Sequence, residues 1–162
     1  MKNIMLALLL SLSFLGCSDE VTAPLEHKVA VGKSLESLQL NDQFDKPHTL
    51  DADTKKVVFA FSKDMGHMSN EFFEKQGVGY LRNHKAVYIA DVSSAPSLIR
   101  SMFIMPGLKD FKHTVLVIDD KNLAAAYRNE AHKEEIMILD LKDFIIEKIE
   151  YVTTEEGLAK AL

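Results

Sequence analysis

The sequence has almost no cysteine, and this lack limits the chemistry that the chain can perform. Of its 162 residues only Cys17 carries a thiol, and tryptophan is absent altogether. A single cysteine provides neither a disulfide framework nor the cysteine and histidine spacing of a zinc site. Cys17 also precedes every segment that has the pattern of a folded domain, so the domain itself contains no thiol.

Basic runs and long apolar runs are also scarce. The chain has 24 acidic against 19 basic residues and a formal net charge of −5. An acidic chain without a basic patch lacks the electrostatic footprint of nucleic-acid binding, so we expect no nucleic-acid partner. Beyond the N-terminal leader, no apolar stretch approaches the roughly 20 residues that a transmembrane helix needs. With 47% hydrophobic and 27% charged residues, the rest has the composition of an ordinary globular protein.

The N-terminus has the features of an export signal. Lys2 provides a positive start, and residues 4–15 are apolar except for two serines. This apolar core is too short to span a bilayer, and the polar run Ser18-Asp19-Glu20 follows shortly after it. We therefore predict a signal peptide over residues 1–16.

The end of this leader, Phe14-Leu15-Gly16-Cys17, resembles the lipobox of bacterial lipoproteins, from which the bulky Leu15 departs. In that family the leader is cut before the cysteine, whose sulfur receives diacylglycerol. The resemblance implies that lipid chains such as palmitate on Cys17 anchor the mature protein to the membrane. Ser18, rather than aspartate, follows the lipidated residue. By resemblance to Gram-negative lipoproteins this favours the outer membrane, facing the periplasm. The alternative is an ordinary cleaved leader with an incidental cysteine.

The mature chain divides into a tether and one domain. Residues 17–28 are polar and contain Pro24, which predicts a lipidated tether that reaches roughly 35 Å when extended. Residues 29–162 are enough for one domain with its own hydrophobic core. Their patterns predict a hairpin-like lead-in over 29–50 and a segment at 123–128 that fits either helix or strand. Strands are predicted at 57–61, 86–92, 114–119, 136–140 and 145–152. Helices are predicted at 69–83, 94–107 and 155–162.

This alternation of strands and helices predicts an α/β three-layer sandwich with a central mixed sheet. The order of the elements resembles the thioredoxin-like superfamily, especially its peroxiredoxin and thiol–disulfide branch. Residues 38–46 are similar to that branch's "F-x-L-x-D-Q-x-G-K" opening, and residues 55–62 to the strand that feeds its redox site. Residues 115–140 and 154–156 are similar to its C-terminal pattern. The likeness covers about residues 29–162 and implies a thioredoxin-like domain.

At the next strand-to-helix junction this family carries a reactive Cys-x-x-Cys. Here the matching stretch is Met65-Gly66-His67-Met68, which replaces both cysteines of a Cys-Gly-His-Cys site with methionine. A thioether has no ionisable proton and forms no disulfide, so dithiol exchange and cysteine-based peroxide reduction are excluded. The family's cis-proline is missing as well, because residues 111–113 and 133–135 contain no proline. The resemblance therefore implies a degenerate, redox-inactive site.

We expect such a protein to act by binding an envelope protein or by supporting an assembly at the membrane. No catalytic motif identifies an enzyme. A cleft at the carboxyl ends of the strands would nevertheless survive the loss of the cysteines and leaves room for another activity.

A soft-metal site is the alternative function. Met65, His67 and Met68 are expected on one loop, and two thioethers with an imidazole suit Cu(I) outside the cytoplasm. The competing interpretation is that the methionines fill the space of the missing cysteines, since methionine adapts well to irregular gaps. The same argument predicts core positions for Met102, Met105 and Met137.

Two pairs of carboxylates are weaker candidates. Asp51 with Asp53, and Asp119 with Asp120, provide the side chains for acid–base work or for a cation. Both pairs lie at strand ends, where aspartate usually serves turns, and we favour that interpretation.

Three further polar residues lie near the predicted redox junction. His113 is positioned to approach the functional face of the sheet, although a lone histidine is more often a hydrogen-bonded surface residue. Ser62 and Ser69 flank the degenerate loop, but no Gly-x-Ser-x-Gly elbow or paired His/Asp pattern identifies either as a nucleophile.

Overall fold

The structure, a computed structural model, describes residues 26–162. The predicted signal peptide, the lipid site at Cys17 and most of the tether lie outside these residues. Within them, no helix combines the length and the apolar character needed to cross a bilayer. Lys28 already donates its backbone N–H to the carbonyl of Ala126 at 2.7 Å, so contacts with the domain begin just before the predicted start at residue 29.

One mixed sheet of seven strands forms the centre of the fold, in the order β2-β1-β5-β4-β3-β6-β7. The three parallel strands lie in the middle: β3 (Lys56–Ala60), β4 (Ala86–Asp91) and β5 (Leu116–Ile118). Antiparallel strands flank them: β1 (Gln39–Asp42), β2 (Pro47–Thr49), β6 (Ile136–Lys142) and β7 (Ile145–Val152). The predicted lead-in hairpin is β1 and β2, and the last predicted strand is an edge strand.

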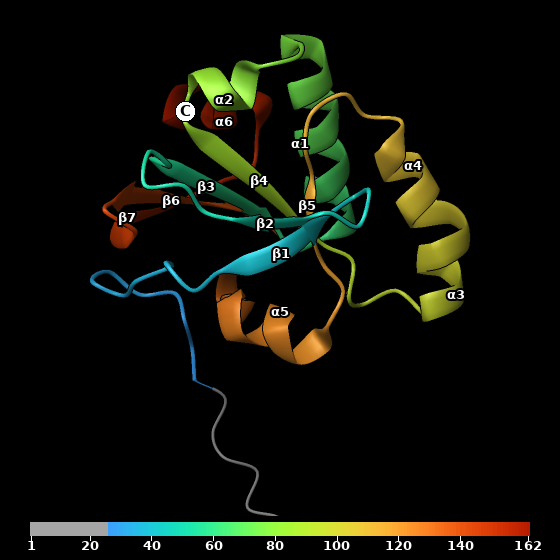
Figure 1. Cartoon of the computed structure of the whole chain (residues 1–162), viewed down its shortest axis with the longest axis horizontal. Helices are drawn as coiled ribbons and strands as arrows, with labels where there is room; N and C mark the ends of the chain where they lie inside the picture. The colour runs from blue at the N-terminus through green and yellow to red at the C-terminus, as the bar shows by residue number, and fades with distance from the viewer. Residues whose placement is uncertain (1–25) are drawn as a thin grey trace, which may run out of the picture.

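Helices cover both faces of the sheet, which confirms the predicted three-layer α/β sandwich (Figure 1). One face carries α1 (Lys63–Gln76), α2 (Tyr80–Asn83), α4 (Met105–Lys109) and α6 (Glu155–Ala161). The other carries α5 (Lys121–Tyr127) and the loop that precedes β1. Short helices α3 (Ser97–Ile99) and η2 (Glu130–His132) complete the chain, together with the π-helical turn η1 (Arg100–Ile104).

Alternation along β3 shows how the sequence builds two cores. Val57 and Phe59 point into the cluster on the α5 side, whereas Val58 and Ala60 point into the cluster under α1. All four are at most 1% exposed. A strand buried on both faces needs a continuous apolar run rather than an alternating one, and the sequence at 57–61 has that run.

Two predicted helices have different boundaries. The helix predicted at 69–83 begins at Lys63, because Ser62 has extended backbone angles and caps it. It ends at Gln76, because Gly77 takes a φ of +85° and closes the helix there, so α2 is a separate element. The helix predicted to stop near Pro106 instead continues through η1 into α4. The segment left open between helix and strand is the helix α5.

The three methionines predicted for the core differ in burial. Met137 is 1% exposed and Met105 packs partly buried against the core, as predicted. Met102 is 58% exposed, so its prediction was wrong. It lies on the outward side of η1, where the helix presents apolar side chains to solvent as well as to the core.

Candidate functional site at the start of helix α1

Helix α1 starts directly after the central strand β3, where Ser62 forms its N-cap. The Ser62 hydroxyl accepts a hydrogen bond from the Met65 backbone N–H at 3.4 Å, and Asp64 places a carboxylate in the first turn. Such a helix start presents unpaired N–H groups and the positive end of the helix dipole. Within residues 26–162, no imidazole or carboxylate forms a hydrogen bond with the Ser62 hydroxyl. The geometry therefore does not activate Ser62 as a nucleophile.

The degenerate stretch Met65-Gly66-His67-Met68 is part of this helix, not of the loop that the sequence predicted. Residues three apart share a helix face, and Met65 and Met68 both pack partly buried against the core cluster under α1. His67 lies between them in sequence and is exposed. The helix thus turns the imidazole and the two sulfurs in different directions. The methionines fill space beside the core, as the competing interpretation expected.

A Cu(I) titration tests the metal site that the sequence suggested at Met65, His67 and Met68. Binding under reducing conditions that is lost when both methionines become leucine would support it. No binding by the unaltered protein would end it. Because the helix separates the three side chains, we expect no Cu(I) binding stronger than that of the Met65→Leu/Met68→Leu protein.

A buried polar network lies directly beneath the first two turns of α1. The Asn70 side-chain amide donates to the Gly66 carbonyl at 2.8 Å, and the Tyr88 hydroxyl donates to the same carbonyl at 3.4 Å. His113 Nε2 lies 3.0 Å from Asn70 Oδ1. Since the Asn70 amide nitrogen faces a carbonyl, its oxygen faces His113, and Nε2 carries the proton. The network links the degenerate stretch to β4 and to the loop before β5.

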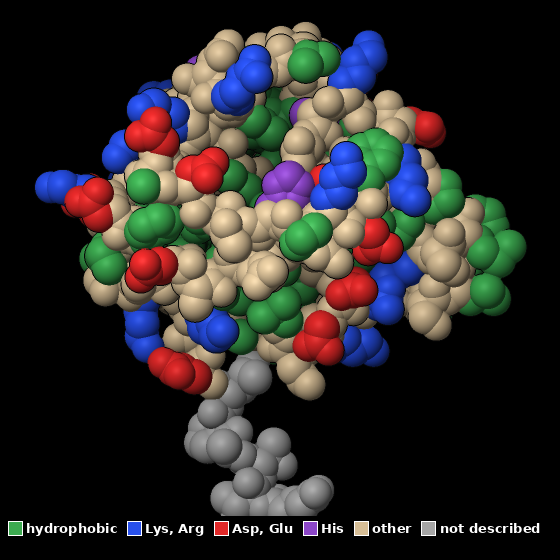
Figure 2. All heavy atoms as spheres, viewed as in Figure 1, with side chains coloured by type: hydrophobic (Ala, Val, Ile, Leu, Met, Phe, Trp, Pro, Cys, Tyr) green, Lys and Arg blue, Asp and Glu red, His purple; other side chains and the backbone are tan. Residues whose placement is uncertain are grey.

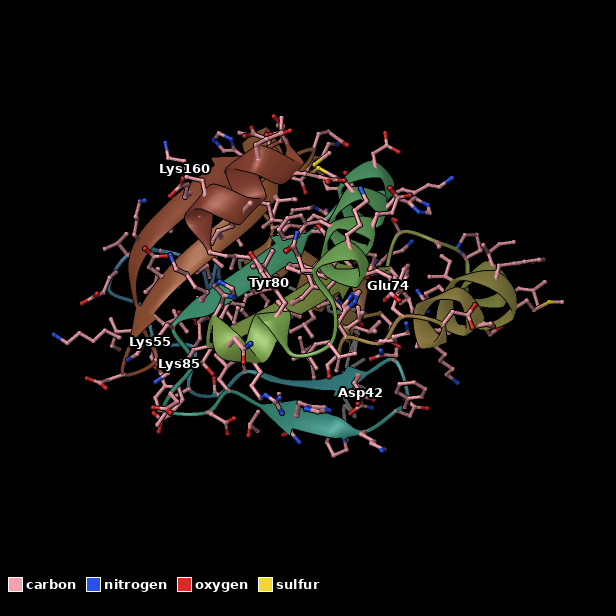
Figure 3. All side chains as sticks on the ribbon, turned by 90° about the horizontal axis from the view of Figure 1, so that it is seen from above. Asp42, Lys55, Glu74, Tyr80, Lys85 and Lys160 are labelled. Carbon is pink, nitrogen blue, oxygen red and sulfur yellow. The ribbon has the colours of Figure 1, made fainter. Side chains whose placement is uncertain are left out.

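His113 differs from its prediction because it is hydrogen-bonded but buried, with 8% of its surface exposed. Its Nδ1 has no hydrogen-bond partner in the described part of the chain, and the nearest carboxylate oxygen, of Glu74, lies 3.9 Å away. Burial lowers the pKa of His113, and the charge of Glu74 opposes this effect. Figure 3 shows Glu74 on the side of α1 that faces the α3–α4 segment. Burial therefore favours the neutral imidazole, while the Glu74 carboxylate favours the charged form.

Asp53, Asp120 and Ser69 have structural positions, whereas Asp51 and Asp119 each line a cleft. Asp120 caps α5 by accepting a hydrogen bond from the Leu123 N–H at 2.8 Å, and Asp53 lies 3.5 Å from the Lys85 ammonium. Ser69 lies on the buried face of α1 and is completely inaccessible to a substrate. Across residues 26–162, no three histidine, cysteine, aspartate or glutamate side chains are grouped to hold a metal ion.

Two clefts open at opposite ends of the central strands. One, of about 610 Å³, lies where β5 ends and is lined by Asp45, Arg100 and Asp119, among others. Ligands of open α/β sheets typically bind outside the carboxyl ends of the strands, and this cleft has that position. The other, of about 550 Å³, lies where β4 begins and includes His48 and Arg82. The sequence predicted a cleft at the carboxyl ends but not which residues line it.

Comparison with known proteins identifies the fold. No family model matches the chain, and no curated protein matches its sequence. Among solved structures, a proposed protein disulfide isomerase from Bacteroides thetaiotaomicron matches at a TM-score of 0.52 with 16% identity, over 84% of this chain and 87% of that one. StoA from Bacillus subtilis matches at 0.51 with 8% identity, over 76% and 94%. The peroxidoxin BcpB from Mycobacterium tuberculosis matches at 0.50 with 16% identity, over 81% and 92%.

The chain therefore has a thioredoxin-like fold, distantly similar in structure to a proposed protein disulfide isomerase and to peroxiredoxins. At such low sequence identity, structural similarity establishes the fold alone. The function has to be argued from the residues of the site. At the site, the start of α1 carries a serine hydroxyl and two thioethers, and residues 26–162 contain no cysteine.

Proposed function

We propose that this protein is a lipid-anchored binding or assembly module of the bacterial cell envelope that works without redox chemistry. One observation carries the proposal: the capped start of α1 is present on a thioredoxin-like sheet, yet no thiol lies there. Met65 and Met68 are packed partly against the core, and Ser62 serves as the cap. The fold keeps the helix start in place, and residues 26–162 contain no thiol that could exchange a disulfide.

Binding is the role that the remaining features support. The cleft at the end of β5 combines three aspartates, Asp42, Asp45 and Asp119, with the guanidinium of Arg100, so it offers polar contacts of both signs. Arg100 donates to the carbonyls of Ser93 and Ala95 at 3.4 and 3.3 Å, which fixes it at the rim. Such a rim suits a protein partner in the envelope, recognised through hydrogen bonds and ion pairs.

The anchoring part of the proposal comes from the lipobox-like sequence before Cys17. Two long acyl chains and a third on the amine would hold the protein durably, because each buried methylene contributes about 0.8 kcal/mol. With Ser18 next in the chain, we place the protein at the outer membrane, facing the periplasm.

Cys17→Ser tests the anchoring. We expect the unaltered chain to incorporate labelled palmitate and to fractionate with membranes. The variant should lose the label and move to the soluble fraction, because its hydroxyl is not a substrate for thioether formation. Ser18→Ala keeps the cysteine and is the matched control, which should behave like the unaltered chain. Unchanged membrane association of Cys17→Ser, or absence of label in the unaltered chain, would refute lipid anchoring.

A further inference from the structure

The helical segment over residues 97–109, made of α3, η1 and α4, presents an apolar face to solvent. Leu98, Met102 and Phe103 are 64%, 58% and 64% exposed, and Ile99 is 42% exposed. Figure 2 shows hydrophobic side chains gathered at the edge where this segment lies. Single exposed apolar side chains are common on proteins, but four on adjoining turns form a patch that indicates an interaction surface.

Packing against the domain does not explain this patch. The opposite side of the same segment already contacts the core through Ile104, Met105 and Leu108. A surface helix normally has one apolar face and one polar face. Here the side turned away from the sheet is apolar too. Its apolar area can be buried only if a second surface covers it.

The charged side chains within the segment itself have one sign, whereas Asp110 follows it directly and Asp42, Asp45 and Asp119 line the cleft beside Arg100. Residues 92–109 contain no aspartate or glutamate, although the chain has 24 of them, and their only charged side chains are Arg100 and Lys109. The segment therefore contains no carboxylate that an anionic surface would repel, although the chain as a whole is acidic. Apolar side chains flanked by basic residues are the composition of helices that lie in the headgroup region of membranes.

The size of the patch and the length of the tether favour a bilayer over a second copy of the chain. Even a fully buried large aromatic side chain covers only about 150–250 Å². At exposed fractions of 42–64%, the four side chains present roughly 340–570 Å², short of the roughly 800 Å² per partner of a stable protein interface. The nine peptide steps from Cys17 to Glu26 reach at most about 30 Å, so an anchored domain stays beside the lipid surface.

We propose that the patch of Leu98, Ile99, Met102 and Phe103 lies in the headgroup region of an anionic bilayer, the membrane to which Cys17 is attached. This inference rests on the proposed lipid anchoring, because the anchor is what holds the domain near the membrane. Lys109 then faces lipid phosphates, and the patch fixes which side of the domain is turned away from the membrane. Two attachments, the lipid and the patch, hold the domain in one orientation, since the tether raises the local concentration of the patch at the surface.

The absence of tryptophan makes a direct test possible. Phe103→Trp introduces one fluorophore into the patch, and Phe44→Trp introduces one at a separate exposed phenylalanine, 51% exposed, as the matched control. Both core clusters lie within residues 29–162, so the chain from residue 17 onward retains them. Its only thiol, Cys17, is coupled to a maleimide-bearing lipid in vesicles of phosphatidylethanolamine and phosphatidylglycerol.

On these vesicles we expect the Phe103→Trp emission to shift to the blue and to be quenched by brominated acyl chains. The Phe44→Trp emission should stay at its solvent-exposed wavelength. Adding Leu98→Ser and Met102→Ser should abolish the shift, and vesicles of phosphatidylcholine alone should weaken it. An unshifted Phe103→Trp emission, or equal shifts at both positions, would overturn the proposal.

A blue shift that grows with protein concentration without vesicles would also overturn it, because a second copy would then cover the patch. The lipid is attached chemically in this experiment. Its failure therefore leaves the proposed lipidation untouched, which the palmitate labelling of Cys17 tests separately.

Discussion

Ser62→Cys together with Met65→Cys, made in a Cys17→Ser background, is expected to give this protein disulfide-exchange activity. The structure places residue 62 at the N-cap and residue 65 in the first turn, and the side chain of one already contacts the N–H of the other. A thiol at a helix N-cap has a lowered pKa, because the dipole and the free N–H groups stabilise the thiolate. The pair also has the Cys-x-x-Cys spacing.

Met65→Cys with Met68→Cys is the matched control, because it has the same spacing one turn further along. These thiols would lie partly buried against the core, where apolar surroundings raise a thiol's pKa. We expect insulin reduction, driven by dithiothreitol, to be clearly faster with the 62/65 pair than with the 65/68 pair. Thiolate absorbance against pH should show the lower pKa at residue 62. Greater activity of the 65/68 pair, with both proteins folded, would contradict the helix start described here.

His113 is expected to make the stability of the domain depend on pH. Burial lowers its pKa in the folded protein, while in the unfolded chain it titrates at about 6.5. Below that pH the unfolded chain takes up a proton that the folded protein resists, so this contribution to stability is present at neutral pH and is lost as the pH falls. The groups that face the ring are Glu74 and Asn70 on α1 and Tyr88 on β4, with Lys112 beside it. Only Glu74 favours protonation.

Denaturant unfolding of His113→Phe measures this effect. Phenylalanine keeps the ring contacts with Phe73 and Phe111 but leaves Asn70 Oδ1 without its donor. We expect a loss of about 1–3 kcal/mol at neutral pH, the usual cost of an orphaned buried polar group. Between about pH 7.5 and pH 5.5 the variant should lose less stability than the unaltered protein. His67→Phe, at an exposed position, is the control. Parallel pH curves for the His113→Phe and unaltered proteins would refute the assignment.

The sheet could be predicted because its signals are local. The run at 57–61 is apolar without alternation, which only a strand covered on both faces requires, and it became the buried strand β3. The last strand alternates in polarity and became the edge strand β7. The final helix was also predicted at 155–162, and Thr154 caps it by accepting a hydrogen bond from the Gly157 N–H at 3.0 Å.

The start of α1 was predicted too late because the resemblance to a redox loop assigned residues 65–68 to the loop. A local signal for the earlier start was present: Ser62 follows a strand directly and Asp64 lies two residues later, which is typical of a helix N-terminus. The network beneath the helix had no such signal. Asn70 and His113 are 43 residues apart in sequence, and only the packing of α1 on the sheet brings them together.

The exposed patch could not be predicted because apolar residues occur on both sides of the segment at 97–109. When Met102 and Met105 are both apolar, periodicity does not indicate which one faces the core. The structure shows Met105 against the core and Met102 in solvent, and that difference supports the proposed membrane contact.

The most direct measurement is the reductase activity of the Cys17→Ser protein, which has no sulfhydryl group anywhere in its chain. Supplied with dithiothreitol and either insulin or an organic hydroperoxide, it should consume neither substrate faster than buffer does. Sustained turnover of either substrate would contradict the proposal that this thioredoxin-like domain works by binding and without redox chemistry.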